Sequence, residues 1–103
     1  MELQSHWVQT TDQQRLYVKT WGKSENPVVV LVHGYPDNQD VWEPVIQYLI
    51  HDYYIVTYDV RGAGMSSVPR RTRAYALPQL SLDLESVVNS VIPQRSFHLV
   101  AHD

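Results

Sequence analysis

The first residues whose types suggest chemistry are His33, Gly34, Tyr35 and Pro36, directly after the apolar run 28–32. A glycine at such a point lets the backbone approach a reacting group closely. The backbone N–H of Tyr35 is then a candidate donor to a developing oxyanion, and the Tyr35–Pro36 bond is a candidate for the cis form. An ordinary turn at the end of a strand would use the same residues.

A second polar segment, residues 59–66, contains Asp59, Arg61, Gly62 and Gly64. The two glycines suit left-handed backbone, and the two charged residues either pair with each other or cap the turn. The segment lacks both a P-loop lysine and the third glycine of a dinucleotide-binding motif, which argues against a phosphate-binding loop. We interpret it as a structural loop beside the site.

The third segment is Ala101, His102 and Asp103, at the end of another apolar run. In a nucleophile elbow, a small residue and one further residue precede the nucleophile at a tight strand-to-helix turn. Asp103 stands at the nucleophile position, where a carboxylate attacks carbon and forms an ester. By itself, a carboxylate at the end of a strand is equally typical of a solvated cap.

These three segments follow three apolar runs, residues 28–32, 54–58 and 97–101. Such runs, rich in β-branched and aromatic residues, predict strands buried in a parallel sheet. The carboxyl ends of parallel strands lie at one edge of the sheet, where ligands of α/β proteins bind. We therefore expect the three polar segments to meet at that edge.

The remaining elements follow from periodicity. Apolar residues recur at helical spacing over residues 41–50 and 80–92, and Asp40 with Glu43 suggests a capping box before the first helix. The first 21 residues predict a hairpin whose second strand alternates in polarity. The expected fold is α/β, with an N-terminal β-hairpin followed by β-α-β-α-β and a mostly parallel sheet.

Composition narrows the class further. The 103 residues carry a net charge of −3, with 44% apolar and 18% charged residues, as in one small globular domain without general affinity for nucleic acid or anionic lipid. The absence of cysteine excludes disulfides, thiolate catalysis and cysteine-ligated metals. There is no signal-peptide pattern and no apolar run near the roughly 20 residues of a membrane span. We expect a cytoplasmic protein with no metal or cofactor and no nucleic-acid or membrane partner.

The order and spacing of the three segments resemble the α/β-hydrolase fold family over essentially the whole chain. The matching patterns are His-Gly-x-Pro at 33–36, Asp-x-Arg-Gly-x-Gly-x-Ser at 59–66 and small-His-Asp at 101–103. His-Gly-x-Pro combined with an aspartate nucleophile is the pattern of the epoxide hydrolase branch. Residues 67–103 are also similar to the hydrolase part of bacterial fusions in which a short-chain dehydrogenase domain follows.

The resemblance implies a role for each matching position. Asp103 would open a small-molecule epoxide and form an alkyl-enzyme ester, with the Tyr35 N–H as an oxyanion donor. His33, Gly34 and Pro36 would shape the oxyanion loop. In the family, the histidine base, its acidic partner and the tyrosines of the cap lie in the C-terminal half. Residues 1–103 are therefore expected to be a partial domain, truncated at the nucleophile elbow and inactive alone.

Two alternatives stay open. A haloalkane or haloacid dehalogenase of the same fold also uses an aspartate nucleophile, although haloalkane dehalogenases commonly place Asn or Trp where this chain has Tyr35. The second is a truncated, non-catalytic interaction module. A serine esterase is disfavoured because the chain has no Gly-x-Ser-x-Gly. For a truncated domain, the apolar strand 97–101 would form an open edge, which predicts self-association.

Overall fold

The structure, a computed structural model, describes residues 3–102 of the chain. Strands and helices alternate after an N-terminal hairpin, and two short 3-10 helices (η) precede the α-helices. The elements in chain order are β1 (Leu3–Gln9), β2 (Arg15–Trp21), β3 (Val28–Val32), η1 (Gln39–Trp42), α1 (Glu43–Leu49), β4 (Tyr54–Tyr58), η2 (Thr72–Tyr75), α2 (Leu77–Val91) and β5 (Phe97–Ala101). This is the predicted order of hairpin, then β-α-β-α-β.

The strands form one mixed sheet in the order β1-β2-β4-β3-β5. β3 lies between β4 and β5 and is parallel to both, whereas β1 pairs with β2, and β2 with β4, in the antiparallel sense. The predicted α/β architecture, a hairpin followed by β-α-β-α-β, is confirmed. Its parallel part comprises β4, β3 and β5, and the hairpin extends the sheet on the other side of β4.

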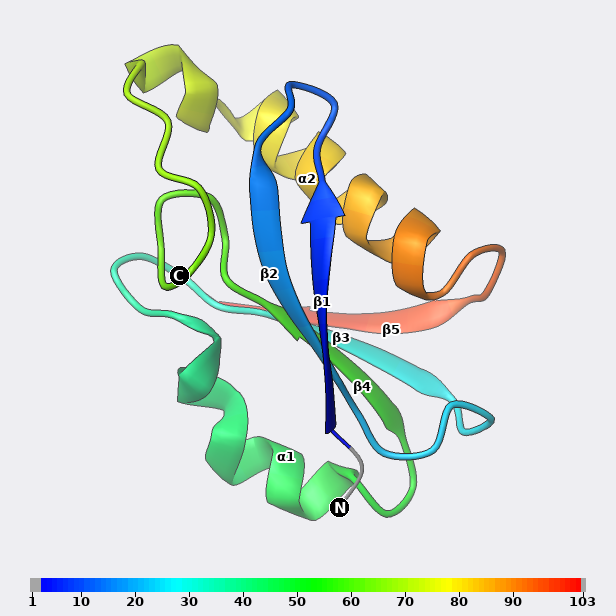
Figure 1. Cartoon of the computed structure of the whole chain (residues 1–103). Helices are drawn as coiled ribbons and strands as arrows, with labels where there is room; N and C mark the ends of the chain where they lie inside the picture. The colour runs from blue at the N-terminus through cyan, green and yellow to red at the C-terminus, as the bar shows by residue number, and fades with distance from the viewer. Residues whose placement is uncertain (1–2, 103) are drawn as a thin grey trace.

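Each face of the sheet carries its own apolar core. On one face Val28 and Val30 of β3 belong to a cluster with Val87 of α2. On the other face Val29 and Leu31 belong to a cluster with residues of η1 and α1. Figure 1 shows α1 and α2 on opposite sides of the sheet. β3 is thus buried on both faces, as its uninterrupted apolar sequence predicts.

The second strand of the hairpin also matches its pattern, with one difference. Leu16, Val18 and Thr20 are buried, as their alternation predicts. Trp21 lies on the opposite face from these residues, yet it is only 6% exposed. Its ring belongs to the cluster beneath α1, and its indole N–H donates to the Thr57 hydroxyl at 3.1 Å. Tertiary packing therefore overrides the alternation at this residue.

The start of each helix differs from the sequence-based prediction. The expected Asp40–Glu43 capping box is wrong: Asn38 is the cap, and its side chain accepts the Asp40 N–H ahead of η1. α2 begins at Leu77, ahead of the predicted start at residue 80, with proline in its first turn. Proline is tolerated there because the first N–H groups of a helix have no acceptor within it. Neither helix among residues 3–102 is both long and apolar enough to cross a lipid bilayer.

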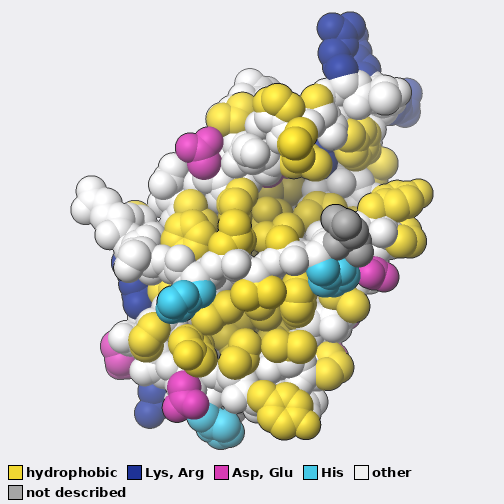
Figure 2. All heavy atoms as spheres, turned by 180° about the vertical axis from the view of Figure 1, so that it is seen from behind, with side chains coloured by type: hydrophobic (Ala, Val, Ile, Leu, Met, Phe, Trp, Pro, Cys, Tyr) yellow, Lys and Arg dark blue, Asp and Glu magenta, His cyan; other side chains and the backbone are white. Residues whose placement is uncertain are grey.

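β5 forms one edge of the sheet, and all five of its residues are exposed. Phe97, Leu99 and Val100 are 36%, 50% and 45% exposed. Figure 2 shows apolar side chains gathered on both sides of a band of backbone that crosses this face of the molecule. Within residues 3–102 this strand pairs only with β3, so it has the open apolar edge that the sequence predicts.

Candidate active site

The polar segments after β3, β4 and β5 meet at the edge of the sheet that the carboxyl ends of these strands form, because the three strands are parallel and adjacent. The His102 N–H donates to the Val32 carbonyl at 3.3 Å, which places the end of β5 beside the end of β3. The His102 ring is exposed and meets the ring of Trp42 edge-on, with centroids 5.1 Å apart. Asp103, the predicted nucleophile, directly follows but lies outside the described residues.

A cavity of about 630 Å³ opens at this edge, between α2 and the sheet. Its walls come from the loop after β3, the ends of β4 and β5, and the first half of α2. They include Gly34, Tyr35, Tyr58, Leu80, Leu99 and His102. Burial, and secondarily the negative charge of Asp83, raise the pKa of the Tyr58 phenol well above its usual range, so its hydroxyl keeps its proton. The volume and mostly apolar walls suit a small organic ligand.

The predicted oxyanion loop turns tightly above this cavity. The Tyr35–Pro36 peptide bond is cis, and the Asp37 N–H donates to the Gly34 carbonyl at 2.9 Å. The Tyr35 side chain is 92% exposed. No acceptor within residues 3–102 receives the Tyr35 N–H. This edge of the sheet therefore offers a free backbone donor, the group that an oxyanion requires.

His33 connects this loop to the neighbouring strand. Its ring is buried, with Nδ1 at 2.9 Å from the Gly34 carbonyl oxygen and Nε2 accepting the Val60 N–H at 3.0 Å. Gly34 and Pro36 lie in the same turn, which the Asp37 N–H closes on the Gly34 carbonyl.

Asp59 organises the loop after β4. One oxygen of its buried carboxylate accepts the Gln39 N–H at 2.8 Å and the other accepts the Met65 N–H at 3.0 Å. Gly64, with φ of +50°, passes so close that a Cβ atom there would overlap this carboxylate. Of the two roles that the sequence left open, Asp59 therefore takes the turn cap, and its pairing with Arg61 is wrong.

Arg61 pairs instead with two carboxylates that the sequence analysis missed. Its side chain is fully buried, and its Nε and Nη2 atoms lie 2.6 and 2.7 Å from the two oxygens of Asp83 on α2. Its Nη1 and Nη2 atoms lie 2.8 and 2.9 Å from those of Asp12 in the hairpin turn. Nη1 also donates to the Ala74 carbonyl at 2.8 Å. Every guanidinium N–H thus has an acceptor, and Arg61 joins the hairpin, η2 and α2 to the loop beside the site.

The sequence does indicate that Asp83 has a partner. It lies among the apolar residues of α2, one position before Leu84 and four before Val87, where a carboxylate is costly unless it is paired. Asp12 had no comparable signal, because an aspartate in a turn is ordinary. Gly62, with φ of +85°, lies under the ring of Tyr75, which leaves no room for a side chain.

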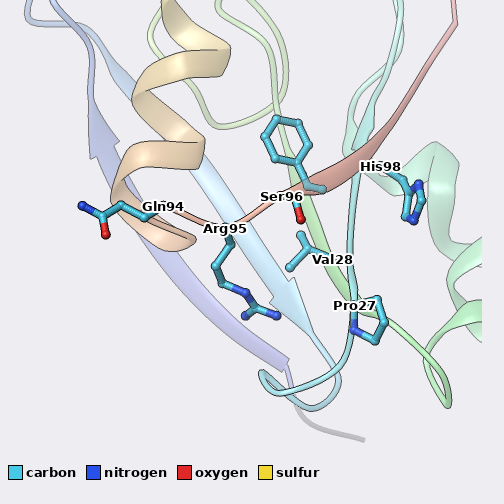
Figure 3. A pocket seen from close by; sticks show the side chains of 7 residues that line it. Pro27, Val28, Gln94, Arg95, Ser96 and His98 are labelled. Carbon is cyan, nitrogen blue, oxygen red and sulfur yellow. The ribbon is translucent and has the colours of Figure 1, made fainter.

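A second hollow, of about 420 Å³, lies at the opposite edge of the sheet, at the amino ends of the parallel strands, next to the first residues of β3 and β5. Figure 3 shows Arg95, Pro27 and His98 around it. The Arg95 guanidinium donates to the carbonyls of Ser24 and Asn26 at 2.6 and 2.8 Å. These hydrogen bonds fix the loop before β3 and occupy the guanidinium. We therefore assign no ligand site to this hollow.

Comparison with known proteins agrees with this geometry. Residues 27–103 match the family model described as alpha/beta hydrolase fold, and the chain belongs to that family. Among its relatives, the probable oxidoreductase EphD of Mycobacterium tuberculosis is 38% identical over 99 residues, which cover 96% of this chain and 17% of that protein. Epoxide hydrolase A of the same organism is 35% identical over 94 residues, covering 90% of this chain and 29% of that protein.

A solved structure gives the same assignment. Epoxide hydrolase A from Mycobacterium thermoresistibile superposes with a TM-score of 0.88 and 29% identity, over 99% of this chain and 32% of that one. The chain therefore spans a third or less of each of these three proteins. It has the α/β-hydrolase fold and epoxide hydrolase-like relatives.

We predict that replacing Arg61 by methionine destabilises the fold. The change leaves Asp83, whose side chain is 3% exposed, buried without its cation. Breaking a buried pair in this way costs about 3–5 kcal/mol of unfolding free energy. Urea unfolding measures the effect, and Arg73→Met, at an exposed arginine, is the control with about 0.5 kcal/mol or less. A similarly small loss for Arg61→Met would contradict the role assigned to this residue. Adding Asp83→Leu to Arg61→Met removes the unpaired charge and should recover part of the loss.

The Arg61–Asp12 pair also predicts an acid-dependent loss of stability. Hydrogen bonds from Arg61 lower the pKa of Asp12 from 3.8 to about 2, against the opposing effect of burial. A lowered pKa stabilises the folded state above pH 3.8, and this contribution disappears as the pH falls through about 2. We expect Asp12→Asn to flatten the stability profile across this window in thermal unfolding. The control, Asp52→Asn, changes an exposed carboxylate and should leave the slope as it is; equal slopes for all three proteins would refute the prediction.

Proposed function

We propose that residues 1–103 are the N-terminal part of an epoxide hydrolase that acts through an aspartate nucleophile, Asp103. One observation carries this proposal: the Tyr35 N–H is an unused donor at the edge of the sheet where β5 leads into Asp103. The identity of 35% with an enzyme named epoxide hydrolase A supports the substrate class. The relative named an oxidoreductase, of which the chain covers 17%, supports a larger protein with a dehydrogenase domain.

The chemistry proceeds in two steps. A carboxylate oxygen of Asp103 attacks an epoxide carbon, the carbon–oxygen bond of the ring breaks, and the released alkoxide takes up a proton. Water then attacks the carbonyl carbon of the resulting ester, and the diol leaves. The negative oxygen formed in this second step requires donors, and one donor in that position is worth about 3–4 kcal/mol. The Tyr35 N–H is our candidate for this donor.

The second step also requires a base, and four of the five histidines are poorly placed for it. His6 binds the Thr20 hydroxyl in the hairpin, and both nitrogens of His33 are engaged in the loop. His51 follows α1 and His98 lines the hollow at the opposite edge. His102 immediately precedes the proposed nucleophile, and we assign it no catalytic role. We therefore expect the isolated chain to form the ester without releasing it.

This expectation has a direct test by mass spectrometry. Incubation of the chain with styrene oxide should add the mass of one epoxide, and peptide mapping should place the adduct on Asp103. Asp103→Asn should abolish the adduct, while Asp52→Asn, an exposed carboxylate in the turn before β4, should leave it unchanged. Labelling that survives in Asp103→Asn would remove Asp103 from the mechanism.

The same experiment separates the alternatives. A dehalogenase would release bromide from a bromoalkane and leave the epoxide intact. The tyrosine after Gly34 favours the epoxide, because it offers no side-chain N–H to a halide. A non-catalytic interaction module would form no adduct with either reagent, and that result would overturn the enzymatic proposal.

We also propose that the isolated chain associates with a second copy through β5. Its outer edge has unpaired backbone groups, and its residues Phe97–Ala101 contain no lysine or proline, which natural edge strands use against pairing. An antiparallel pair of β5 strands centred on Leu99 would join the apolar surfaces on both faces of the two sheets (Figure 2). The same argument favours a second copy over a charged partner, since β5 carries neither an acid nor a lysine or arginine.

Sedimentation equilibrium tests this association. The chain should form dimers as its concentration rises, and Leu99→Lys should shift it to monomer because a charge at the centre of the paired edge opposes contact. Leu82→Lys, at a 40% exposed leucine of α2, is the control and should leave dimerisation intact. A chain that stays monomeric at every concentration would contradict the proposal.

A further inference from the structure

Tyr58 is the last residue of β4, and its ring belongs to the apolar cluster on the α2 side of the sheet. The residue is only 3% exposed. A buried phenol usually satisfies its O–H with a hydrogen bond. Within residues 3–102, however, no group forms a hydrogen bond with the Tyr58 hydroxyl. The chain therefore buries a donor for which its described part supplies no acceptor.

Asp83 is the acceptor to consider first, since burial and then the negative charge of Asp83 raise the pKa of the phenol. Both oxygens of this carboxylate are already engaged. Arg61 Nε and Nη2 lie 2.6 and 2.7 Å from them, and Gln79 Nε2 lies 3.1 Å from Oδ1. The carboxylate thus serves the buried arginine, and the phenol, which keeps its proton, is left as an unused donor.

The Tyr58 hydroxyl is also accessible from the cavity of about 630 Å³ between α2 and the sheet, which this residue lines. In the described part of the chain, the only buried side-chain polar atom that both lacks a partner and is sealed from solvent is Trp42 Nε1. The Tyr58 oxygen also lacks a partner, so it must retain open surface. The cavity that Tyr58 lines provides this surface.

The register of the strands relates Tyr58 to the proposed nucleophile. Val32 of β3 pairs with Tyr58 on one side and with Ala101 on the other, so these three residues form one row across the sheet. Neighbouring strands lie about 4.8 Å apart, which places the backbone of Tyr58 about 10 Å from that of Ala101. Asp103 follows Ala101 two residues later. A ligand that meets both Asp103 and Tyr58 therefore needs a body of comparable length between its two ends.

We propose that the Tyr58 hydroxyl is a specificity-determining donor, which binds an uncharged oxygen acceptor, such as a carbonyl or ether oxygen, of the ligand in this cavity. An anionic acceptor is disfavoured because the carboxylate of Asp83 lines the same cavity. For the substrate, the assignment rests on the function proposed above: the preferred epoxide carries a second oxygen group, separated from its ring by an apolar body. Tyr58 itself takes no part in breaking a bond.

The alternative is that Tyr58 only fills the core or bonds within it. Tyr58→Phe removes the hydroxyl and keeps the ring. A hydroxyl without a protein partner adds nothing to folding, so the urea midpoint of Tyr58→Phe should equal or exceed that of the unchanged chain. A clear fall in this midpoint would show that the hydroxyl is bonded within the fold, and it would overturn the proposal.

Ligand binding then decides whether the hydroxyl is used. The probes 2-acetylnaphthalene and 2-isopropenylnaphthalene have the same shape, and differ by a carbonyl oxygen in place of a methylene group. Titrations followed by the methyl resonances of Leu80 and Leu84, in the wall of the cavity, give a dissociation constant for each. We expect Tyr58→Phe to weaken binding of the ketone by about three- to tenfold, the worth of one neutral hydrogen bond, and to leave that of the hydrocarbon unchanged.

The matched control is Tyr54→Phe, because Tyr54 lies on the same strand and packs against the same cluster but does not line the cavity. It should leave both dissociation constants unchanged. The proposal is overturned if Tyr58→Phe affects the two probes equally, if it affects neither, or if neither probe binds. The probes carry no epoxide, so their binding does not depend on the chemistry of Asp103. Failure of this inference is therefore distinguishable from failure to form the adduct on Asp103.

Discussion

The buried guanidinium of Arg61 is the interaction on which the surroundings of the site depend. A cation without solvent contact is stable in a protein only when anions and carbonyls replace its water. Here the replacement comes from three separate parts of the chain: Asp12 in the hairpin turn, Ala74 in η2 and Asp83 in α2. The loop after β4 is therefore fixed to the turn of the hairpin and to α2, which lines the cavity. Its neighbours Asp59 and His33 hold the loops beside the site.

The architecture could be predicted from sequence because its strands are short, apolar and clearly bounded. The runs at 28–32, 54–58 and 97–101 match β3, β4 and β5. The boundaries of helices were less predictable, since a cap depends on which nearby side chain reaches the free N–H groups. Asn38 does so here, although Asp40 has an equally suitable side chain. Such choices are decided by the path of the loop, which local pattern does not specify.

The candidate site was likewise predictable only in part. The positions of Tyr35, His33 and Gly34 followed from a motif, and the strand order brings them to the expected edge. The partners of Arg61 did not follow, because Asp12 and Asp83 are separated from it by many residues in opposite directions along the chain. Pairing between distant charges requires knowledge of the topology. A carboxylate in an apolar stripe, as at Asp83, indicates only that some cation must be near.

The close approach of Gly64 to Asp59 also limits how this loop can vary in evolution. Any side chain at position 64 would occupy the volume of the carboxylate that receives the Gln39 and Met65 N–H groups. By contrast, Met65 is 61% exposed, and its side chain is free to change. Divergence among proteins that keep this turn should therefore appear at the position of Met65 and spare that of Gly64. The absence of a Cβ atom at position 64 is therefore as necessary for this loop as the hydrogen bonds that Asp59 accepts.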